Sequence, residues 1–340
     1  MKATRNLRRP RVLIVGCGDV GMRCVPLLQP HAHVFALTSH AERSAELRAA
    51  GVTPLVGDLD VRRSLKRLAG LAPTVLHLAP PQKTGDDDRR TRALLATLGV
   101  RRDRALRAAR SAVAPVGRLR RIRASWAESE TADIVPDGVR WTAGSRAPLR
   151  LVYASTTGVY GDCGGVWIDE TRALQAANPR AKRRVSAERQ LRRATARGVV
   201  AASIARIPGI YARNRLPLAR LEKHTPALVD ADDVYTNHIH ADDLAAILVR
   251  MATHGRAARV VHASDDTSLK MGEYFDVVAD AFGFERAPRI TREEAEQQIE
   301  PTLLSFMRES RRLVNRRLKE ELRVRLRYPS VDDFLRAVRG

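Results

Sequence analysis

One short segment constrains the fold more than any other part of the sequence. Residues 11–15 read RVLIV, a run typical of a buried parallel strand, and Gly16, Gly18 and Gly21 follow before a helical stretch over residues 22–28. The first glycine permits a tight turn, the second lets a bound group approach the backbone, and the third lets helix and strand pack closely. Free N–H groups at the helix start favour an anion, so the segment predicts a dinucleotide pyrophosphate site.

Strand and helix patterns alternate through the first hundred residues. Apolar runs at residues 33–37, 52–56 and 74–78 have the length and composition of buried strands, and residues 41–50 and 60–68 between them have helical patterns. Short connections of this kind build βαβ units and a parallel sheet with helices on both faces. We therefore expect a Rossmann-type, doubly wound α/β fold.

The second half of the chain predicts the rest of the sheet and a smaller lobe. Strands are expected at residues 149–153, 199–207, 259–263 and 322–328, and helices at 179–196, 242–253 and 268–282. In the 322–328 strand, arginines alternate with apolar residues and would line an open face. We expect a dinucleotide-binding domain over residues 9–207 and a small C-terminal α/β substrate lobe over 208–340. About residues 236–263 of that lobe would return to the first domain.

The 340 residues carry a formal net charge of +22, which raises the question of nucleic acid as a partner. Nine Arg and one Asp lie in residues 101–125, and eight Arg, one Lys and three Glu lie in residues 307–329. Residues 101–147 read as a basic insertion, without an aromatic residue before Trp126 on which bases could stack. We therefore expect no nucleic acid, and an arginine-rich codon bias explains the excess charge equally well.

Cysteine usage and hydropathy indicate a cytoplasmic chain. Cys17, Cys24 and Cys163 are too few for a disulfide framework and form no Cys-x-x-Cys pair. The longest apolar runs are too short for a signal peptide core or a membrane-spanning helix. His238 and His240 alternate on a predicted strand, but no third ligand is evident, so no metal is expected.

The second predicted strand bears on which dinucleotide binds. An NAD site usually has an acid at the end of this strand to hold the ribose hydroxyls, whereas Ser39 stands here and the first acid is Glu42. Arg43 lies one turn into the helix, where it could contact a 2′-phosphate, so NADP is expected in preference to NAD. Asp58, at the end of the third strand, is placed to meet the adenine. Asp19, inside the glycine loop, would repel phosphate if it pointed inward.

Residues 153–162, YASTTGVYGD, resemble the S-S/T-x-x-V-Y-G signature of extended short-chain dehydrogenases, the NAD-dependent epimerase/dehydratase family. Other landmarks agree in order and spacing: the glycine loop, Asp58-Leu59, HLAP at residues 77–80, RIPGIY at 206–211 and NHIHADDL at 237–244. The resemblance covers about residues 11–98 and 149–265. It implies an oxidoreductase or epimerase that acts on a small molecule, such as one related to nucleotide sugars, with a homodimer as a candidate assembly.

The resemblance also assigns roles to individual residues. Thr156 occupies the catalytic Ser/Thr position, where it would donate a hydrogen bond to a substrate oxygen. Tyr211, Asn237 and His240 would touch substrate. The loop pattern and the resemblance together predict these cofactor contacts: Gly16, Gly18, Asp19, Val20, Gly21, Ser39, Arg43, Asp58, Leu59, Ala79, Pro80, Pro208 and Gly209.

The family's Tyr-x-x-x-Lys pair is missing from this sequence. Counted back from Glu188, its two places are taken by Arg180 and Arg184, and no tyrosine lies between Tyr160 and Tyr211. An arginine stays protonated, so it cannot replace the tyrosine as general acid or base.

Two interpretations follow from this loss. In the first, the chain is an enzyme in which Tyr160, Asp162 or Tyr211 moves the proton, while Arg180 and Arg184 contact an anionic substrate or a cofactor phosphate. In the second, the chain binds NADP(H) without turning it over and reports its presence to a partner.

Overall fold

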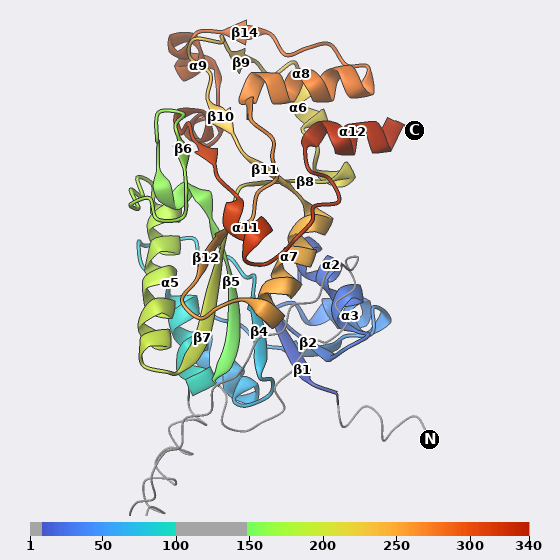
Figure 1. The fold of residues 1–340 in the computed structure, drawn as a ribbon, viewed down its shortest axis with the longest axis vertical. Helices are drawn as coiled ribbons and strands as arrows, with labels where there is room; N and C mark the ends of the chain where they lie inside the picture. The colour runs from blue at the N-terminus through green and yellow to red at the C-terminus, as the bar shows by residue number, and fades with distance from the viewer. Residues whose placement is uncertain (1–8, 100–147, 340) are drawn as a thin grey trace, which may run out of the picture.

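A computed structural model describes residues 9–99 and 148–339, and seven parallel strands form one sheet at its centre (Figure 1). The strand order β12-β7-β5-β4-β1-β2-β3 is that of a doubly wound Rossmann sheet, which confirms the predicted fold class. The predicted basic insertion, residues 101–147, lies outside the described residues. The strands are β1 (Arg11–Val15), β2 (His33–Thr38), β3 (Thr53–Val56), β4 (Thr74–His77), β5 (Leu149–Thr156), β7 (Val200–Ile207) and β12 (Val260–His262).

Helices cover both faces of this sheet because each central strand is apolar on both sides. In β1, Val12 and Ile14 pack into a core shared with α2 (Asp19–Leu28), α3 (Ser44–Ala49) and α7 (Ala241–His254). Leu13 and Val15 pack into a second core, which includes residues of the helix over 89–99 and of α5 (Pro179–Ala196). Two buried cores on either side of the sheet fix its position and leave only its edges open.

Local signals set the helix ends most sharply in α5. The Asn178 side chain accepts a hydrogen bond from the Ala181 N–H, and Pro179 occupies the first turn, where its missing N–H costs nothing. This helix has the bounds that the sequence predicts. Residues 60–68 differ, because their regular part is a 3₁₀ helix, η2 (Arg62–Leu68).

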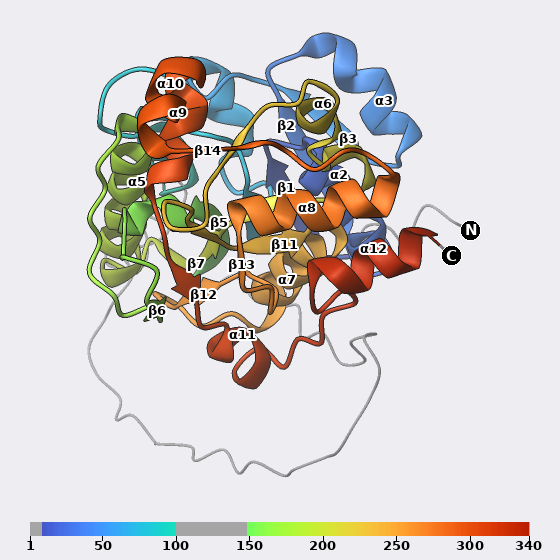
Figure 2. The same ribbon diagram turned by 90° about the horizontal axis from the view of Figure 1, so that it is seen from above.

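The smaller lobe packs over the carboxyl edge of the sheet (Figures 1 and 2). Its core joins α6 (Leu218–Glu222), α8 (Met271–Phe282) and α12 (Val331–Arg339), and β8 (Gly209–Tyr211) pairs in parallel with β11 (His238–His240). Its remaining elements are η4 (Arg213–Arg215), β9 (Ala227–Leu228), β10 (Tyr235–Thr236), β13 (Leu269–Lys270), β14 (Arg289–Ile290), α9 (Arg292–Gln298), α10 (Pro301–Leu304), η5 (Ser305–Arg308), β15 (Arg312–Leu313) and α11 (Arg316–Glu320). The other short elements are η1 (Ala41–Arg43), η3 (Thr157–Tyr160) and β6 (Trp167–Ile168).

The prediction of a strand over residues 322–328 is wrong. The alternation of covered apolar residues and exposed arginines is present, but the segment pairs with no strand of the described residues. Its backbone donors go elsewhere: the N–H groups of Arg327 and Tyr328 donate to the Asp243 carboxylate, at 2.7 and 3.0 Å. The alternation of apolar residues and arginines therefore indicates that one side of the segment is buried, and not that the segment is a strand of a sheet.

Four buried histidines make the fold acid-sensitive. Burial lowers the pKa of His77 to about 3 and those of His238, His240 and His262 to about 4. Between about pH 4 and 6.5 the unfolded chain therefore takes up protons that the folded chain does not, and stability falls as pH falls, on the order of 1 kcal/mol per histidine at pH 5.5. Burial also raises the pKa of Asp265, to about 7, and those of Glu170, Asp233 and Asp243, which opposes the effect of the histidines. Hydrogen bonds lower the pKa of acids such as Asp60, Asp87 and Glu321, which adds to the effect of the histidines. Urea unfolding midpoints should drop steadily from pH 7 to pH 4.5, and a constant or rising midpoint would contradict the prediction.

No helix among the described residues is both long enough and apolar enough to cross a membrane. In the same part of the chain, no three His, Cys, Asp or Glu side chains are grouped closely enough to bind a metal ion.

Candidate functional site

The predicted cofactor residues gather at the carboxyl edge of the sheet. This is the edge at which doubly wound sheets bind ligands, next to the point where the strand order reverses between β1 and β4. The glycine loop with Asp19 and Val20 follows β1, Ser39 and Arg43 follow β2, Asp58 and Leu59 follow β3, Ala79 and Pro80 follow β4, and Pro208 and Gly209 follow β7.

The three loop glycines meet different surroundings. Gly16 has a φ of +88°, and a Cβ there would lie 2.5 Å from the Ala79 backbone nitrogen. At Gly21 an added Cβ would be 3.3 Å from the Cys17 Sγ, so this glycine lets α2 pack against the loop. At Gly18 it would meet nothing within 4 Å. Gly18 thus faces open space at the start of α2, which is the room that a pyrophosphate needs.

Arg43 lies directly beside this loop. Its guanidinium donates to the Cys17 carbonyl at 2.8 Å and forms two hydrogen bonds with the Glu46 carboxylate. Ser39 is exposed. The end of β2 therefore presents a hydroxyl and an anchored positive charge next to the glycine loop.

Asp58 and Leu59 contact mainly the protein's own backbone and core. The Asp58 carboxylate accepts from the Asp60 N–H at 2.8 Å, and Ser64 Oγ bonds to the Asp58 backbone. Leu59 is buried in the core beneath. Asp58 remains only half-buried at the end of β3, so the predicted adenine contact is compatible with its position.

The Asp19 carboxylate is paired with arginines. It accepts hydrogen bonds from Arg23 at 3.2 Å and from Arg215, which belongs to η4 of the lobe, at 2.9 Å. The sequence suggested that Asp19 would repel a phosphate, and the positive charges of Arg23 and Arg215 offset this repulsion.

Thr156 ends β5, and its hydroxyl and a carboxylate of the lobe both lie near Gly158. A Cβ added at Gly158 would lie 3.7 Å from Thr156 Oγ1 and 3.9 Å from Glu309 Oε2, so both oxygens border the same small space. Glu309 is held there by Arg311 at 2.9 Å and by the Asn178 amide at 3.4 Å. Glu309 and Arg311 are only 14% and 12% exposed, so this pair is largely shielded from water.

The two arginines at the Tyr and Lys positions differ in their contacts. Arg184 donates to the Ala154 carbonyl at 2.5 Å and to the Tyr153 hydroxyl at 3.1 Å, which fixes it against β5. Partial burial lowers the pKa of Arg180, and the nearby Glu309 carboxylate opposes this. Positive charge therefore occupies the place where the family has its proton-transfer pair.

Tyr160 is inside the protein, which argues against its predicted catalytic role. Only 1% of the residue is exposed. Its hydroxyl accepts from Arg206 at 2.6 Å and lies 2.6 Å from His262 Nε2. Because His262 Nδ1 faces the Val314 carbonyl at 2.9 Å, that nitrogen carries the proton and Nε2 accepts from Tyr160. Burial raises the pKa of Tyr160 to about 12.

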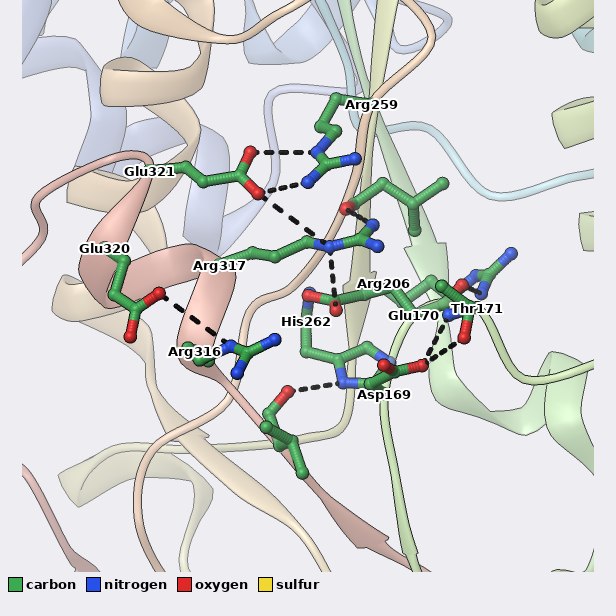
Figure 3. Close-up of polar contacts among 12 residues, drawn as sticks. Asp169, Glu170, Thr171, Arg206, Arg259, His262, Arg316, Arg317, Glu320 and Glu321 are labelled. Atoms are coloured by element: carbon green, nitrogen blue, oxygen red, sulfur yellow. Dashed lines mark hydrogen bonds and ion pairs between the residues drawn. The ribbon is translucent and has the colours of Figure 1, made fainter.

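Ion pairs extend from this buried region toward the surface (Figure 3). Arg206 donates to both carboxylate oxygens of Glu188, and Ser155 also donates to Glu188, at 2.7 Å. Nearby, Glu170 accepts from the His262 N–H and pairs with Arg317 of α11 (Figure 3). The bond between Ser155 and Glu188 fixes the end of β5, where Thr156 lies.

The other polar candidates are also occupied or enclosed. Both ends of the Asn237 amide bond to the backbone of Arg311 and Leu313, at 2.9 Å each. His240 is buried and accepts from the Asp242 N–H at 3.3 Å, which caps α7. The Asp162 carboxylate accepts from two backbone N–H groups. Tyr211 is 1% exposed, and burial raises its pKa. Backbone groups therefore hold Asn237, His240 and Asp162, and Tyr211 is enclosed.

One large cavity in the described part of the chain lies elsewhere. It has a volume of about 740 Å³ and runs between α5 and residues 86–92. Its lining includes none of the predicted catalytic or cofactor residues. We therefore locate the site by the glycine loop and Thr156, and not by cavity size.

Fold and loop together define a dinucleotide-binding Rossmann protein of the short-chain dehydrogenase type. Residues 12–263 match the model of the NAD dependent epimerase/dehydratase family, and the chain belongs to that family. This confirms the resemblance drawn from the sequence. A comparison with curated proteins gives no match.

Solved structures agree in fold over nearly the whole chain. A protein of unknown function from Silicibacter pomeroyi DSS is 25% identical, with 97% of this chain and 98% of that chain covered and a TM-score of 0.69. A dTDP-glucose 4,6-dehydratase from Streptomyces venezuelae, solved with NAD, is 18% identical, with 97% and 96% covered and a TM-score of 0.67. A UDP-glucose 4-epimerase from Thermotoga maritima is 14% identical, with 97% covered in both and a TM-score of 0.68.

Sequence reasoning missed Glu309, Arg311, Arg23 and Arg215. The first two lie about 150 residues from Thr156 in the sequence, and no local pattern marks them. Arg215 is likewise 196 residues from Asp19. Only Arg23, four residues after Asp19 on a predicted helix, had a usable signal, the i,i+4 spacing of opposite charges.

Proposed function

We propose that the chain is an NADP(H)-dependent oxidoreductase or epimerase that acts on an anionic small molecule with non-standard catalytic residues. The observation that carries this proposal is the convergence of Thr156 Oγ1 and Glu309 Oε2 on one space, with Arg180 beside Glu309. A hydroxyl donor, a carboxylate and a guanidinium suit a substrate that carries both a reacting oxygen and a negative charge.

Each residue then has a stated task. The dinucleotide, when bound, supplies or accepts the hydride. Thr156 donates a hydrogen bond to the reacting substrate oxygen, and Arg180 binds the anionic group of the substrate. Glu309, whose carboxylate is paired with Arg311, accepts the proton of a substrate hydroxyl. Arg184, fixed against β5, places a positive charge at the position of the family's lysine.

NADP is preferred to NAD because of Arg43. Its guanidinium lies beside the glycine loop, and Ser39 replaces the acid that holds the ribose hydroxyls in NAD sites. A 2′-phosphate at this position would gain a charge-assisted contact, whereas an acid would repel it.

Arg43→Glu should therefore weaken NADP+ binding by roughly a hundredfold and NAD+ binding by less than about threefold, since only NADP+ carries the 2′-phosphate. Calorimetric titration of both dinucleotides measures the two losses. Arg48→Glu, on the exposed side of α3, is the matched charge control. Equal losses for the two dinucleotides would mean that Arg43 does not contact the 2′-phosphate.

The activity itself is tested with a panel of carbonyl and hydroxy compounds, half of them carboxylates or phosphates, monitored by NADPH absorbance. We expect turnover with anionic members and its loss in Thr156→Val. Glu309→Gln should lower the rate of alcohol oxidation far more than the affinity for NADPH.

The second candidate function is a non-catalytic NADP(H) sensor. It is favoured by the burial of Tyr153, Tyr160 and Tyr211, which leaves the site without a tyrosine hydroxyl among these three. If the protein binds NADPH with micromolar affinity but turns over no compound of the panel, the enzyme proposal is refuted and the sensor proposal is supported.

A further inference from the structure

A cluster of charges joins the lobe to the first turn of the dinucleotide helix. Asp19, the first residue of α2, accepts from Arg23 Nε at 3.2 Å and from Arg215 Nε at 2.9 Å. Arg23 also pairs with Asp242 of α7 and donates to Asn214 Oδ1 at 3.3 Å. The η4 segment of the lobe is therefore tied to α2 by two arginines.

This cluster adjoins the place where a pyrophosphate would bind. Gly18 precedes Asp19 and faces open space, and the free N–H groups of the first turn of α2 are the donors for the anion. A carboxylate at this point opposes the approach of two phosphate charges. Such a residue is tolerable in a dinucleotide site only if positive charge offsets it.

Arg215 is better placed than Arg23 to respond to a bound anion. Arg23 is shared among Asp19, Asp242 and Asn214, so moving it would break three contacts. Arg215 has Asp19 as its described side-chain partner and is 36% exposed, so its guanidinium can turn toward a neighbouring phosphate at little cost.

We propose that Arg215 is a dinucleotide-binding residue supplied by the substrate lobe. It neutralises Asp19 and donates to the pyrophosphate. The inference rests on the proposed function only in that the chain must bind a dinucleotide. The pyrophosphate is common to NAD+ and NADP+. Arg215 should therefore contribute equally to the affinities for both dinucleotides, in contrast to Arg43.

The test is calorimetric titration of NADP+ and NAD+ into wild type, Arg215→Ala, Asp19→Asn and the double variant. Arg215→Ala should weaken both dinucleotides by about tenfold, because a charge-assisted contact is lost and Asp19 is left uncompensated. Asp19→Asn should tighten both by about threefold. The double variant should lie within about threefold of wild type, and 0.5 M salt should reduce all of these differences.

Arg213→Ala is the matched control, since Arg213 is an exposed arginine of the same η4 segment and should change affinity by less than about twofold. The thermal midpoint of each variant is recorded as well. If Arg215→Ala lowers the midpoint but leaves both affinities unchanged, the pair is only a structural link between lobe and helix, and the inference is overturned. An effect on NADP+ alone also overturns it. If wild type binds neither dinucleotide, the proposed function fails with it.

Discussion

Gly18→Val is expected to abolish dinucleotide binding, at least a hundredfold loss, without unfolding the protein. Gly18 has a φ of −83°, which any residue adopts, and an added Cβ meets no atom within 4 Å. The valine side chain would therefore fill only the space that the pyrophosphate needs. Calorimetry with NADPH gives the affinity, and circular dichroism with a thermal scan shows whether the fold persists.

The matched variant in the same loop is Gly16→Val, which we expect to lower the stability of the fold and not only the affinity for the dinucleotide. Gly16 has a φ of +88°, and its Cβ would lie 2.5 Å from the Ala79 backbone, so the variant should lose stability itself. Unchanged NADPH titration in Gly18→Val would refute the cofactor site. Unfolding of Gly18→Val would show that the loop is not as open as described.

Arg206→Met should lower the free energy of unfolding by about 3–5 kcal/mol, the range typical when one partner of a buried ion pair is removed. Arg206 and Glu188 are each 1% exposed, and the variant leaves the Glu188 carboxylate without its main partner. Tyr160 loses its guanidinium donor at the same time. Urea unfolding at pH 7 measures the loss.

Arg259→Met is the control for this prediction, because its ion pair with Glu321 lies at the surface, with side chains 37% and 24% exposed. Surface pairs contribute about 1 kcal/mol or less. Replacing both buried partners, Arg206→Met with Glu188→Leu, should recover part of the stability. Similar losses in Arg206→Met and Arg259→Met would contradict a buried role for the first pair.

The fold was predictable because its signals are local. The run over residues 11–15 and the loop after it define the first strand, turn and helix of a βαβ unit within about twenty residues. Asn178 and Pro179 likewise mark the start of α5, through a side-chain cap and a missing donor. The strand expected over 322–328 failed for the complementary reason, since pairing depends on a distant partner, and the donors there bind Asp243 instead.

The site was predictable only in part. The sequence shows the replacement of the Tyr-Lys pair and predicts a role for Thr156, because both positions lie within recognisable motifs. It did not distinguish an accessible tyrosine from a buried one, so Tyr160 was named although Arg206 and His262 occupy its hydroxyl. Glu309 comes from a segment that reaches the site only through folding.

The central claim is that NADP(H) binds at the glycine loop, with Arg184 in place of the family's lysine and Glu309 facing the reacting oxygen. The most direct measurement is a crystal structure of the protein grown with NADP+. We predict electron density for the pyrophosphate against Gly18 and for the 2′-phosphate beside Arg43. A structure with the dinucleotide bound elsewhere, or with no dinucleotide at saturating concentration, would contradict the account.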